Sequence, residues 1–400
     1  MGFLRIAVFI VLCPAVLTAN DHNSNILSNK VTGKETIIVK KIPATPVRDQ
    51  YKTSTCWSFS GISLIESELI RTGKGEFDLS EMFIVRYTYE RKAERYIRMH
   101  GKTNFAPGGE TNDVTDVMKK YGIVPESIYT GLKHENGKYI HSEMDKTLHK
   151  YVESVVSDPG KIASDWKSEY RKILDNYLGE VPDSFEYDGQ VFTSSEFAGY
   201  LDINLNNYIM ITSFMHSPYY EPVVLEIPDN WSWAASYNVP LDDFEQIVDS
   251  ALFNGFSVAW AADISEAGFS FSKGMALAPE FLYSPELESE KKKWLKNSDH
   301  EKDNYIFKSG EIIKEVNVTA ENRQAAFDNF STTDDHGMHI LGITSDDSGN
   351  NYYYVKNSWG SKNPYNGYML VSKPYFRYKS ICVMLSKDAL SPEIKQKLSL

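Results

Sequence analysis

Apolar side chains recur at helical spacing in the first part of the chain. Behind Ser54 and Thr55 they fall on one face of a predicted helix over 56–71, which ends at Gly73. The same kind of pattern predicts further helices over about 79–97, 111–121 and 165–178. We therefore expect the first half of the protein to be mainly helical.

Short runs of apolar and aromatic residues dominate the last part of the chain instead. They predict buried strands over 256–260, 340–343, 352–356, 368–371 and 381–385. An extended lead-in is predicted for residues 20–45, and a solvated helix or loop for the densely charged segment 286–303. Helices first and strands last predict an α+β protein with two halves.

The first twenty residues have a pattern of their own. A short basic start with Arg5 is followed by an apolar stretch over 6–17 and a small residue, Ala19. This order is typical of a secretory signal peptide, with cleavage expected near Ala19, although a buried N-terminal helix is an alternative. The pattern predicts export, to a periplasm or to the medium.

Composition and charge exclude several classes of protein. The chain has 400 residues, with 42 Lys and Arg against 54 Asp and Glu, for a net charge of −12. An acidic surface repels phosphate, so nucleic acid is not an expected partner. Beyond the N-terminus no apolar run is long enough to cross a membrane, so no stable membrane insertion is expected. Three cysteines, Cys13, Cys56 and Cys382, are too few for a disulfide-framework protein.

Cys56 stands at the start of the first predicted helix, where unpaired N–H groups and the helix dipole favour negative charge. A thiolate nucleophile would be placed there, although a cysteine taken alone is more often a small buried hydrophobe. A thiolate also needs a base and a group that orients the base. His336 precedes one predicted strand, and Asn357-Ser358-Trp359-Gly360 follows another. The order Cys, His, Asn-x-Trp predicts a nucleophile, a base and an amide that orients the base.

Other chemistry is possible with the same residues. His339 competes with His336 for the role of base, and Asp334 with both histidines could form a metal site. The chain has neither a His-Glu-x-x-His helix nor a cysteine pair, so no metal and no cofactor are expected. Cys382 lies in an apolar run and is predicted to be a buried core thiol.

Four segments carry a resemblance to a known family. Pro46-Val47-Arg48-Asp49-Gln50, the segment from Cys56 to Ser60, Asp335-His336-Gly337 and the segment from Val355 to Gly360 resemble the catalytic segments of papain-like cysteine peptidases. The 280 residues from Cys56 to His336 exceed the about 130–150 of the plain papain type. Enlarged spacing and the absence of structural disulfides are similar to the bleomycin hydrolase, or aminopeptidase C, branch.

The resemblance implies a papain-like two-lobed fold with a large insertion between Cys and His. The implied divisions are a signal peptide over 1–19 and a peptidase over 20–400, in which the nucleophile lobe, the insertion and the β-rich lobe span 46–130, 131–250 and 251–400. It also implies homohexamers. In that branch the C-terminal arm lies in the active-site cleft; the tail here, 391–400, is long enough to fold back, and the sequence leaves open whether it does so.

The implied roles of individual residues follow from the same match. Cys56 is the expected nucleophile, His336 the base, Asn357 its orienting amide and Gln50 the oxyanion donor. The expected substrate-binding residues are Gly108, Gly109 and Asp335, and the expected supporting residues are Trp57 and Trp359. The predicted function is an aminopeptidase acting on peptides outside the cytoplasm.

Two alternatives to this function stay open at the level of sequence. One is a papain-like endopeptidase. The other is a non-catalytic peptide- or sugar-binding protein on the same fold, because Asp229-Asn230-Trp231-Ser232-Trp233 is the kind of loop that stacks on sugars.

Overall fold

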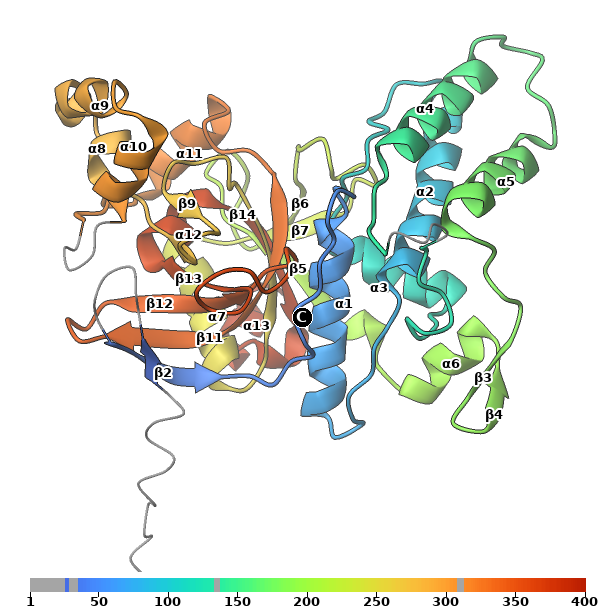
Figure 1. The fold of residues 1–400 in the computed structure, drawn as a ribbon, viewed down its shortest axis with the longest axis horizontal. Coiled ribbons are helices and arrows are strands. Elements are labelled where there is room, and N and C mark those ends of the chain that lie inside the picture. Colours follow the sequence, from blue (N-terminus) through green and yellow to red (C-terminus); the bar gives the residue numbers. More distant parts are fainter. Residues whose placement is uncertain (1–25, 29–34, 133–136, 308–312) are drawn as a thin grey trace, which may run out of the picture.

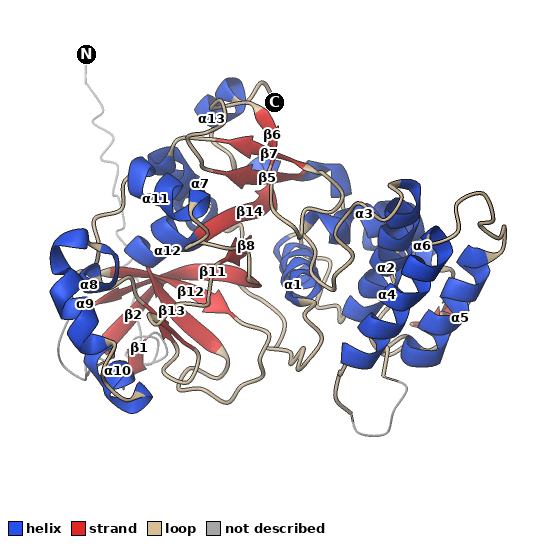
Figure 2. Ribbon diagram, turned by 90° about the horizontal axis from the view of Figure 1, so that it is seen from above, coloured by secondary structure: helices blue, strands red, loops and turns tan. Residues whose placement is uncertain are grey.

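A computed structural model describes residues 26–28, 35–132, 137–307 and 313–400. The predicted signal peptide therefore lies outside the described residues. Within them the chain forms a helical lobe and a β-rich lobe, with helix α1 (Cys56–Arg71) between the two (Figures 1 and 2). This arrangement confirms the predicted α+β class. None of the described helices is long and apolar enough to cross a membrane.

The helical lobe is built from the chain up to about residue 207. Its remaining elements are α2 (Glu81–Arg98), α3 (Asn112–Tyr121), α4 (Ser142–Val156), α5 (Trp166–Leu178), α6 (Ser194–Leu201), η2 (Leu205–Asn207) and the hairpin β3 (Phe185–Tyr187) with β4 (Gln190–Phe192). One apolar cluster that runs from Trp57 to Leu201 fills its core. The predicted helices over 56–71, 79–97, 111–121 and 165–178 are all present.

A single mixed sheet forms the β-rich lobe. Its strands run in the order β6-β7-β5-β14-β8-β11-β12-β13-β10-β9, and β2 pairs with both β1 and β11. The strands are β1 (Ile26–Ser28), β2 (Glu35–Lys41), β5 (Tyr208–Thr212), β6 (Pro222–Val224), β7 (Ala235–Asn238), β8 (Val258–Ala262), β9 (Phe269–Ser270), β10 (Met275–Ala276), β11 (His336–Asp346), β12 (Asn351–Lys356), β13 (Tyr368–Ser372) and β14 (Ser380–Ser386). All five predicted strands are among them.

Helices cover this sheet and close its core. They are α7 (Leu241–Phe253), α8 (Glu280–Tyr283), η3 (Pro285–Leu287), α9 (Glu288–Trp294), α10 (Asp299–Ile306), α11 (Ala320–Asp328), α12 (Lys373–Lys379), η4 (Lys387–Ala389) and α13 (Pro392–Lys397). The charged segment 286–303 forms α9 and most of α10, which lie at the edge of the lobe with mostly exposed side chains (Figure 1). Leu398 is buried in the sheet's core and Lys397 reaches Asp243 of α7, so the C-terminal tail packs against the β-rich lobe.

Segment 131–250, which the sequence predicts to be an insertion, contributes to both lobes. Its helices α4, α5 and α6 pack into the helical core. Strand β5 and helix α7 pack into the core of the β-rich lobe. The segment is thus not a separate domain in space, and its status as an insertion stays a prediction.

Helix α1 holds the two lobes together. Ile62, Ile65 and Leu69 belong to the helical core, whereas Leu64 packs against Ala261 and its neighbours on the sheet. Because apolar side chains cover both of its long faces, α1 is buried almost along its whole length. Its N-terminus is therefore fixed in position relative to the strands of the other lobe.

Candidate active site

A cleft with a volume of about 410 Å³ lies at the N-terminus of α1. Residues from both lobes line it. The cleft brings together eight of the nine predicted site residues: Gln50, Cys56, Trp57, Gly108, Gly109, Asp335, His336 and Trp359. The ninth, Asn357, contacts His336 from behind, as its hydrogen bond shows.

Cys56 is the first residue of α1 and is half-buried. Ser54 before it adopts a left-handed backbone conformation, with φ of 55°, and the side chain of Thr55 makes no capping hydrogen bond to the helix. The first N–H groups of the helix are thus not capped by that side chain. Burial raises the pKa of the Cys56 thiol to about 12, and the charges of Asp334 and Asp229 raise it further, against a hydrogen bond from the backbone N–H of Gly337.

Gly337 allows strand β11 to approach the nucleophile helix. A Cβ atom at this position would lie 3.2 Å from the backbone nitrogen of Trp57 and 2.9 Å from Oγ of Ser60. Both contacts are tighter than a side chain accepts without movement of its neighbours. The absence of a side chain at Gly337 therefore lets its N–H reach the sulfur of Cys56.

His336 is held by Asn357. Nε2 of His336 lies 2.8 Å from Oδ1 of Asn357. The backbone N–H of Ser358 donates to the same oxygen at 2.7 Å, which identifies that atom as the amide oxygen. Nε2 of His336 must then carry the proton, and Nδ1 keeps its lone pair available to accept another.

Burial also controls the charge of His336. It lowers the pKa of the imidazole to about 4, while the hydrogen bond to Asn357 and the charge of Asp335 act in the opposite direction. The indole of Trp359 covers the ring, with 4.6 Å between the ring centroids. Phe271 contacts the indole edge-on, at 5.3 Å between ring centroids, so aromatic groups lie over the His336–Asn357 pair.

Ser358 fixes the orientation of Gln50. Its hydroxyl donates to Oε1 of Gln50 at 2.6 Å, and its carbonyl accepts from the Gln50 backbone N–H at 2.8 Å. With Oε1 taken, the NH₂ group of the Gln50 amide is the end available to the cleft that Cys56 lines. The role of Ser358 was not predicted, because its position beside Gln50 depends on contact between segments that are far apart in sequence.

Hydrogen bonds from two side chains hold the loop that carries Gly108 and Gly109. The indole N–H of Trp57 donates to the carbonyl of Pro107 at 3.1 Å. The buried ammonium of Lys92 donates to the carbonyl of Ala106 at 2.7 Å and also to that of Gly108. The Trp57 hydrogen bond thus holds this loop, and its supporting role in the site stays a prediction. Lys92 was missed because nothing in its local sequence marks it.

Asp335 lines the cleft, but its carboxylate is already hydrogen-bonded to nearby groups of the protein. Its carboxylate accepts hydrogen bonds from the backbone N–H groups of Ile264 and Ser265 and from the hydroxyl of Thr333. These bonds and that from Asp263 hold the pKa of Asp335 low despite its partial burial. They also fix the turn that leads into His336.

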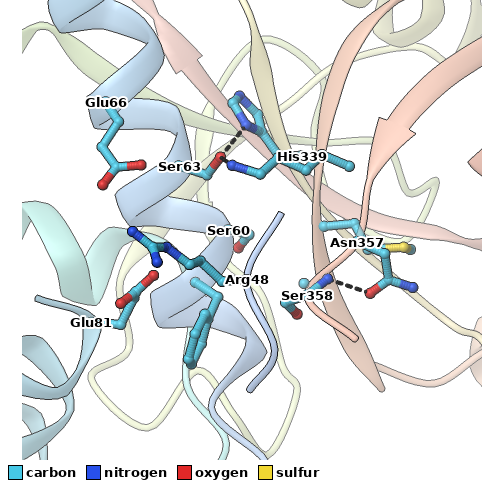
Figure 3. A pocket seen from close by; sticks show the side chains of 12 residues that line it. Arg48, Ser60, Ser63, Glu66, Glu81, His339, Asn357 and Ser358 are labelled. Atoms are coloured by element: carbon cyan, nitrogen blue, oxygen red, sulfur yellow. Dashed lines mark hydrogen bonds between the residues drawn. The ribbon is translucent and has the colours of Figure 1, made fainter. Parts of the chain in front are cut away.

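His339 lies outside the cleft. Its Nδ1 is 2.8 Å from the hydroxyl of Ser63 on α1, and Lys356 donates to the same hydroxyl (Figure 3). Burial and the neighbouring charge of Lys356 keep the pKa of His339 well below its usual value. Of the two histidines, His336 is therefore the one that lines the same cleft as Cys56. The described residues hold no group of three or more side chains placed to bind a metal ion.

Two further predicted features are located as well. Cys382 is buried, as predicted, and its S–H donates to Oε2 of Glu110; Cys56 and Cys382 are both unpaired thiols. In the loop proposed to stack on sugars, Trp231 is buried and its indole N–H donates to Asp113 at 2.8 Å. Trp233 is exposed, with the guanidinium of Arg95 over its ring. The loop does not present two open aromatic faces.

Comparisons with known proteins match both halves of this site. The model of the papain family cysteine protease matches residues 35–181, which include Gln50 and Cys56. The model of the peptidase C1-like family matches residues 289–400, which include His336 and Asn357.

Whole-chain relatives agree with these matches. Aminopeptidase C of Lactococcus lactis subsp. cremoris is 22% identical over 87% of this chain and 82% of its own length. Aminopeptidase G of Lactobacillus delbrueckii subsp. lactis is 20% identical over 93% of this chain and 88% of its own. The solved structure of PepW from Lactobacillus rhamnosis has a TM-score of 0.68 at 19% identity, covering 90% of this chain and 84% of its own. The chain belongs to the papain-like cysteine peptidases, in the branch of aminopeptidase C.

Proposed function

We propose that this cysteine peptidase is an aminopeptidase that works through Cys56, His336 and Asn357. The observation that carries the proposal is the placement of His336. Its Nε2 is bound to Asn357, and its ring lines the same cleft as Cys56 at the start of α1. The names of the relatives, which match nearly the whole chain, support the specificity for a free N-terminus.

The proposed reaction begins with proton transfer from Cys56 to Nδ1 of His336. Burial disfavours either charge alone, so the thiolate and imidazolium form together and stabilise each other. The sulfur then attacks the peptide carbonyl, and the side-chain amide of Gln50 with the backbone N–H of Cys56 stabilises the oxyanion. His336 returns its proton to the leaving amine, and water hydrolyses the thioester that remains.

Turnover by single variants tests these roles. We expect Cys56→Ala and His336→Ala to lose turnover of an aminoacyl-coumarin amide. His339→Ala, which removes a buried histidine outside the cleft, serves as the matched control and should keep most of it. Near-full activity of His336→Ala would contradict the proposed base.

A non-catalytic binding protein is the other class to exclude. If Cys56 is an activated nucleophile, iodoacetamide adds one carboxamidomethyl group to it, and the rate falls at low pH and in His336→Ala. Peptide mapping by mass spectrometry identifies the labelled residue. Equal labelling of Cys56 in the wild type and in His336→Ala would favour the non-catalytic alternative.

We also propose that the protein acts outside the cytoplasm, on the strength of the basic, apolar and small-residue order of residues 1–19. Fractionation of expressing cells, with N-terminal sequencing of the exported form, tests this.

Hexamer formation, implied by family resemblance, is a prediction that light scattering on the purified protein checks.

A further inference from the structure

Several carboxylates line the active-site cleft. Glu110, Asp229, Asp334 and Asp335 all line it, and Lys52 is the one lysine or arginine among the lining residues in the described part of the chain. Asp335 is satisfied by three donors, as described above. The remaining three carboxyl groups have no catalytic role in the proposed reaction.

Glu110 is the least exposed of the three, with 4% of its surface exposed. Its Oε2 accepts from the thiol of Cys382 at 3.3 Å. No donor within the described ranges reaches its Oε1, which is buried. The Glu110 carboxyl also lies within hydrogen-bonding reach of that of Asp334. Two carboxyl groups this close must share a proton or hold a cation between them.

Burial favours the protonated form of this pair. Burial raises the pKa of Glu110 well above its usual value, and the charge of Asp334 adds to this effect. Burial raises the pKa of Asp334 to about 7, and the charge of Asp229 adds to it. Near neutral pH the pair therefore exchanges its proton readily, and a bound cation could replace that proton.

Two of these acids act electrostatically on Cys56. Asp334 and Asp229 are the two charged groups that raise the pKa of Cys56. Asp229 also fills the space beside Gly108, because a Cβ atom there would lie 1.9 Å from Oδ2 of Asp229. Lys92 is the cation that lowers the pKa of Asp229, but its ammonium already donates to the carbonyls of Ala106 and Gly108.

We propose that Glu110 and Asp334, with Asp229 beside them, form the subsite that binds the α-ammonium group of the substrate. This inference rests on the proposed aminopeptidase function and names the residues that select the free N-terminus. In an N-terminal residue the amine is two bonds of about 1.5 Å each from the scissile carbonyl carbon. A substrate whose carbonyl meets the sulfur of Cys56 thus carries its ammonium group within a few ångströms of that sulfur, in the cleft that these acids also line.

The C-terminal tail does not supply this charge. Its helix α13 packs against α7, where Lys397 reaches Asp243, and Leu398 is buried in the core of the β-rich lobe (Figure 2). None of the residues 391–400 lines the cleft. The sequence left open whether the tail enters the cleft; in this structure residues 391–400 lie outside it, and the acids that line the cleft recognise the amine instead.

Binding to an inactive enzyme tests the subsite separately from catalysis. The background is Cys56→Ala, and the probes are leucinamide, N-acetyl-leucinamide and N-acetyl-lysinamide, measured by calorimetry. We expect leucinamide to bind, N-acetyl-leucinamide not to bind, and Glu110→Gln or Asp334→Asn to weaken leucinamide at least tenfold. Glu226→Gln removes an exposed acid outside the cleft and should change nothing.

The pH dependence of binding adds a second readout. Leucinamide should bind more tightly as the pH rises through about 7, where the acid pair loses its proton. It should bind more weakly above the amine's own pKa of about 8. Both variants replace a buried acid by its neutral isostere, and thermal melting will show that they fold.

Three results would overturn the inference. The first is no binding of leucinamide, and the second is equal binding by the parent and both variants. The third is tighter binding of N-acetyl-lysinamide through the same acids, which would assign them to a basic side chain. If leucinamide fails to bind but iodoacetamide still labels Cys56 in the active enzyme, the subsite proposal fails and the proposed peptidase chemistry remains. The failure of the subsite is therefore distinguishable from the failure of the proposed function.

Discussion

At the scale of single residues, the site is a chain of side chains that orient one another. Ser358 holds the carbonyl end of Gln50, and its backbone N–H holds the oxygen of Asn357. Asn357 in turn fixes which nitrogen of His336 carries the proton. The side chains of Gln50 and His336 are therefore each oriented by a neighbouring residue.

Alanine variants of Gln50 and Ser358 should lower kcat by different amounts. Removing one oxyanion donor costs on the order of 10²–10³ in rate, so Gln50→Ala should lower kcat by about this factor. Ser358→Ala leaves the donor in place but lets its amide rotate, and should lower kcat less, with KM little changed. Steady-state kinetics of both variants measures the split; equal losses would contradict a positioning role for Ser358.

The variant Asp334→Asn should weaken the binding of the substrate amine but increase the reactivity of the Cys56 thiol. The charge of Asp334 raises the pKa of Cys56, and at pH 8 Asp334 itself is mostly ionised because its own pKa is about 7. Asp334→Asn removes that charge, so labelling of Cys56 by iodoacetamide at pH 8 should be faster than in the wild type. Slower or unchanged labelling would show that the charge does not act on the thiol.

At the scale of elements, the site depends on how closely β11 approaches α1. The approach is possible because Gly337 has no side chain facing the backbone of Trp57. The resulting hydrogen bond from its N–H to the sulfur of Cys56 joins the first residue of α1 to a strand of the β-rich lobe. Close backbone contact of this kind cannot be read from the local pattern of either element.

Gly337→Ala should therefore destabilise the protein and impair the site together. Overpacking of this kind costs about 1–3 kcal/mol. Gly199→Ala is the matched control, because a Cβ at Gly199 in α6 meets no atom within 4 Å. Alanine there should be neutral or stabilise by about 0.5–1 kcal/mol. Denaturant unfolding compares the two, and equal stabilities would contradict the tight contact.

At the scale of the whole molecule, buried polar groups lie between the lobes. Glu66 of α1 accepts hydrogen bonds from the N–H of Leu79 and from the hydroxyl of Thr45. The ammonium group of Lys356 in β12 donates to the same hydroxyl. Figure 3 shows Glu66 beside Arg48 and Glu81. Burial raises the pKa of Glu66 to about 7. The lobes are thus joined through a carboxyl group that is uncharged in mildly acidic solution.

The sign of the resulting pH effect follows from linkage. The folded pKa of Glu66 is above the unfolded one, so its contribution to stability is complete below about pH 4.5 and is lost as the pH rises through about 7. The loss amounts to about 3 kcal/mol. Glu66→Gln should remove it, so the variant should gain stability relative to the wild type between pH 5 and pH 8. A constant difference in unfolding free energy would contradict the shift.

The sequence pattern was sufficient for much of this architecture. The helix that begins at Cys56, the strands before and after the His336 and Asn357 segments, and the buried Cys382 are local features and were predicted. The pairing of Glu110 with Asp334, the position of Ser358 beside Gln50 and the docking of the C-terminal tail were not. These contacts join segments that are far apart in the chain, and only the topology of the two lobes brings them together.

The most direct test of the central claim compares one substrate with and without a free amine. Purified protein without residues 1–19, and its Cys56→Ala variant, are assayed with leucyl-coumarin amide and with N-acetyl-leucyl-coumarin amide. A cysteine aminopeptidase releases coumarin from the free-amine substrate, fails with the acetylated one, and loses the activity in Cys56→Ala. Cleavage of the acetylated substrate in preference to the free one, or activity that survives in Cys56→Ala, would contradict the account.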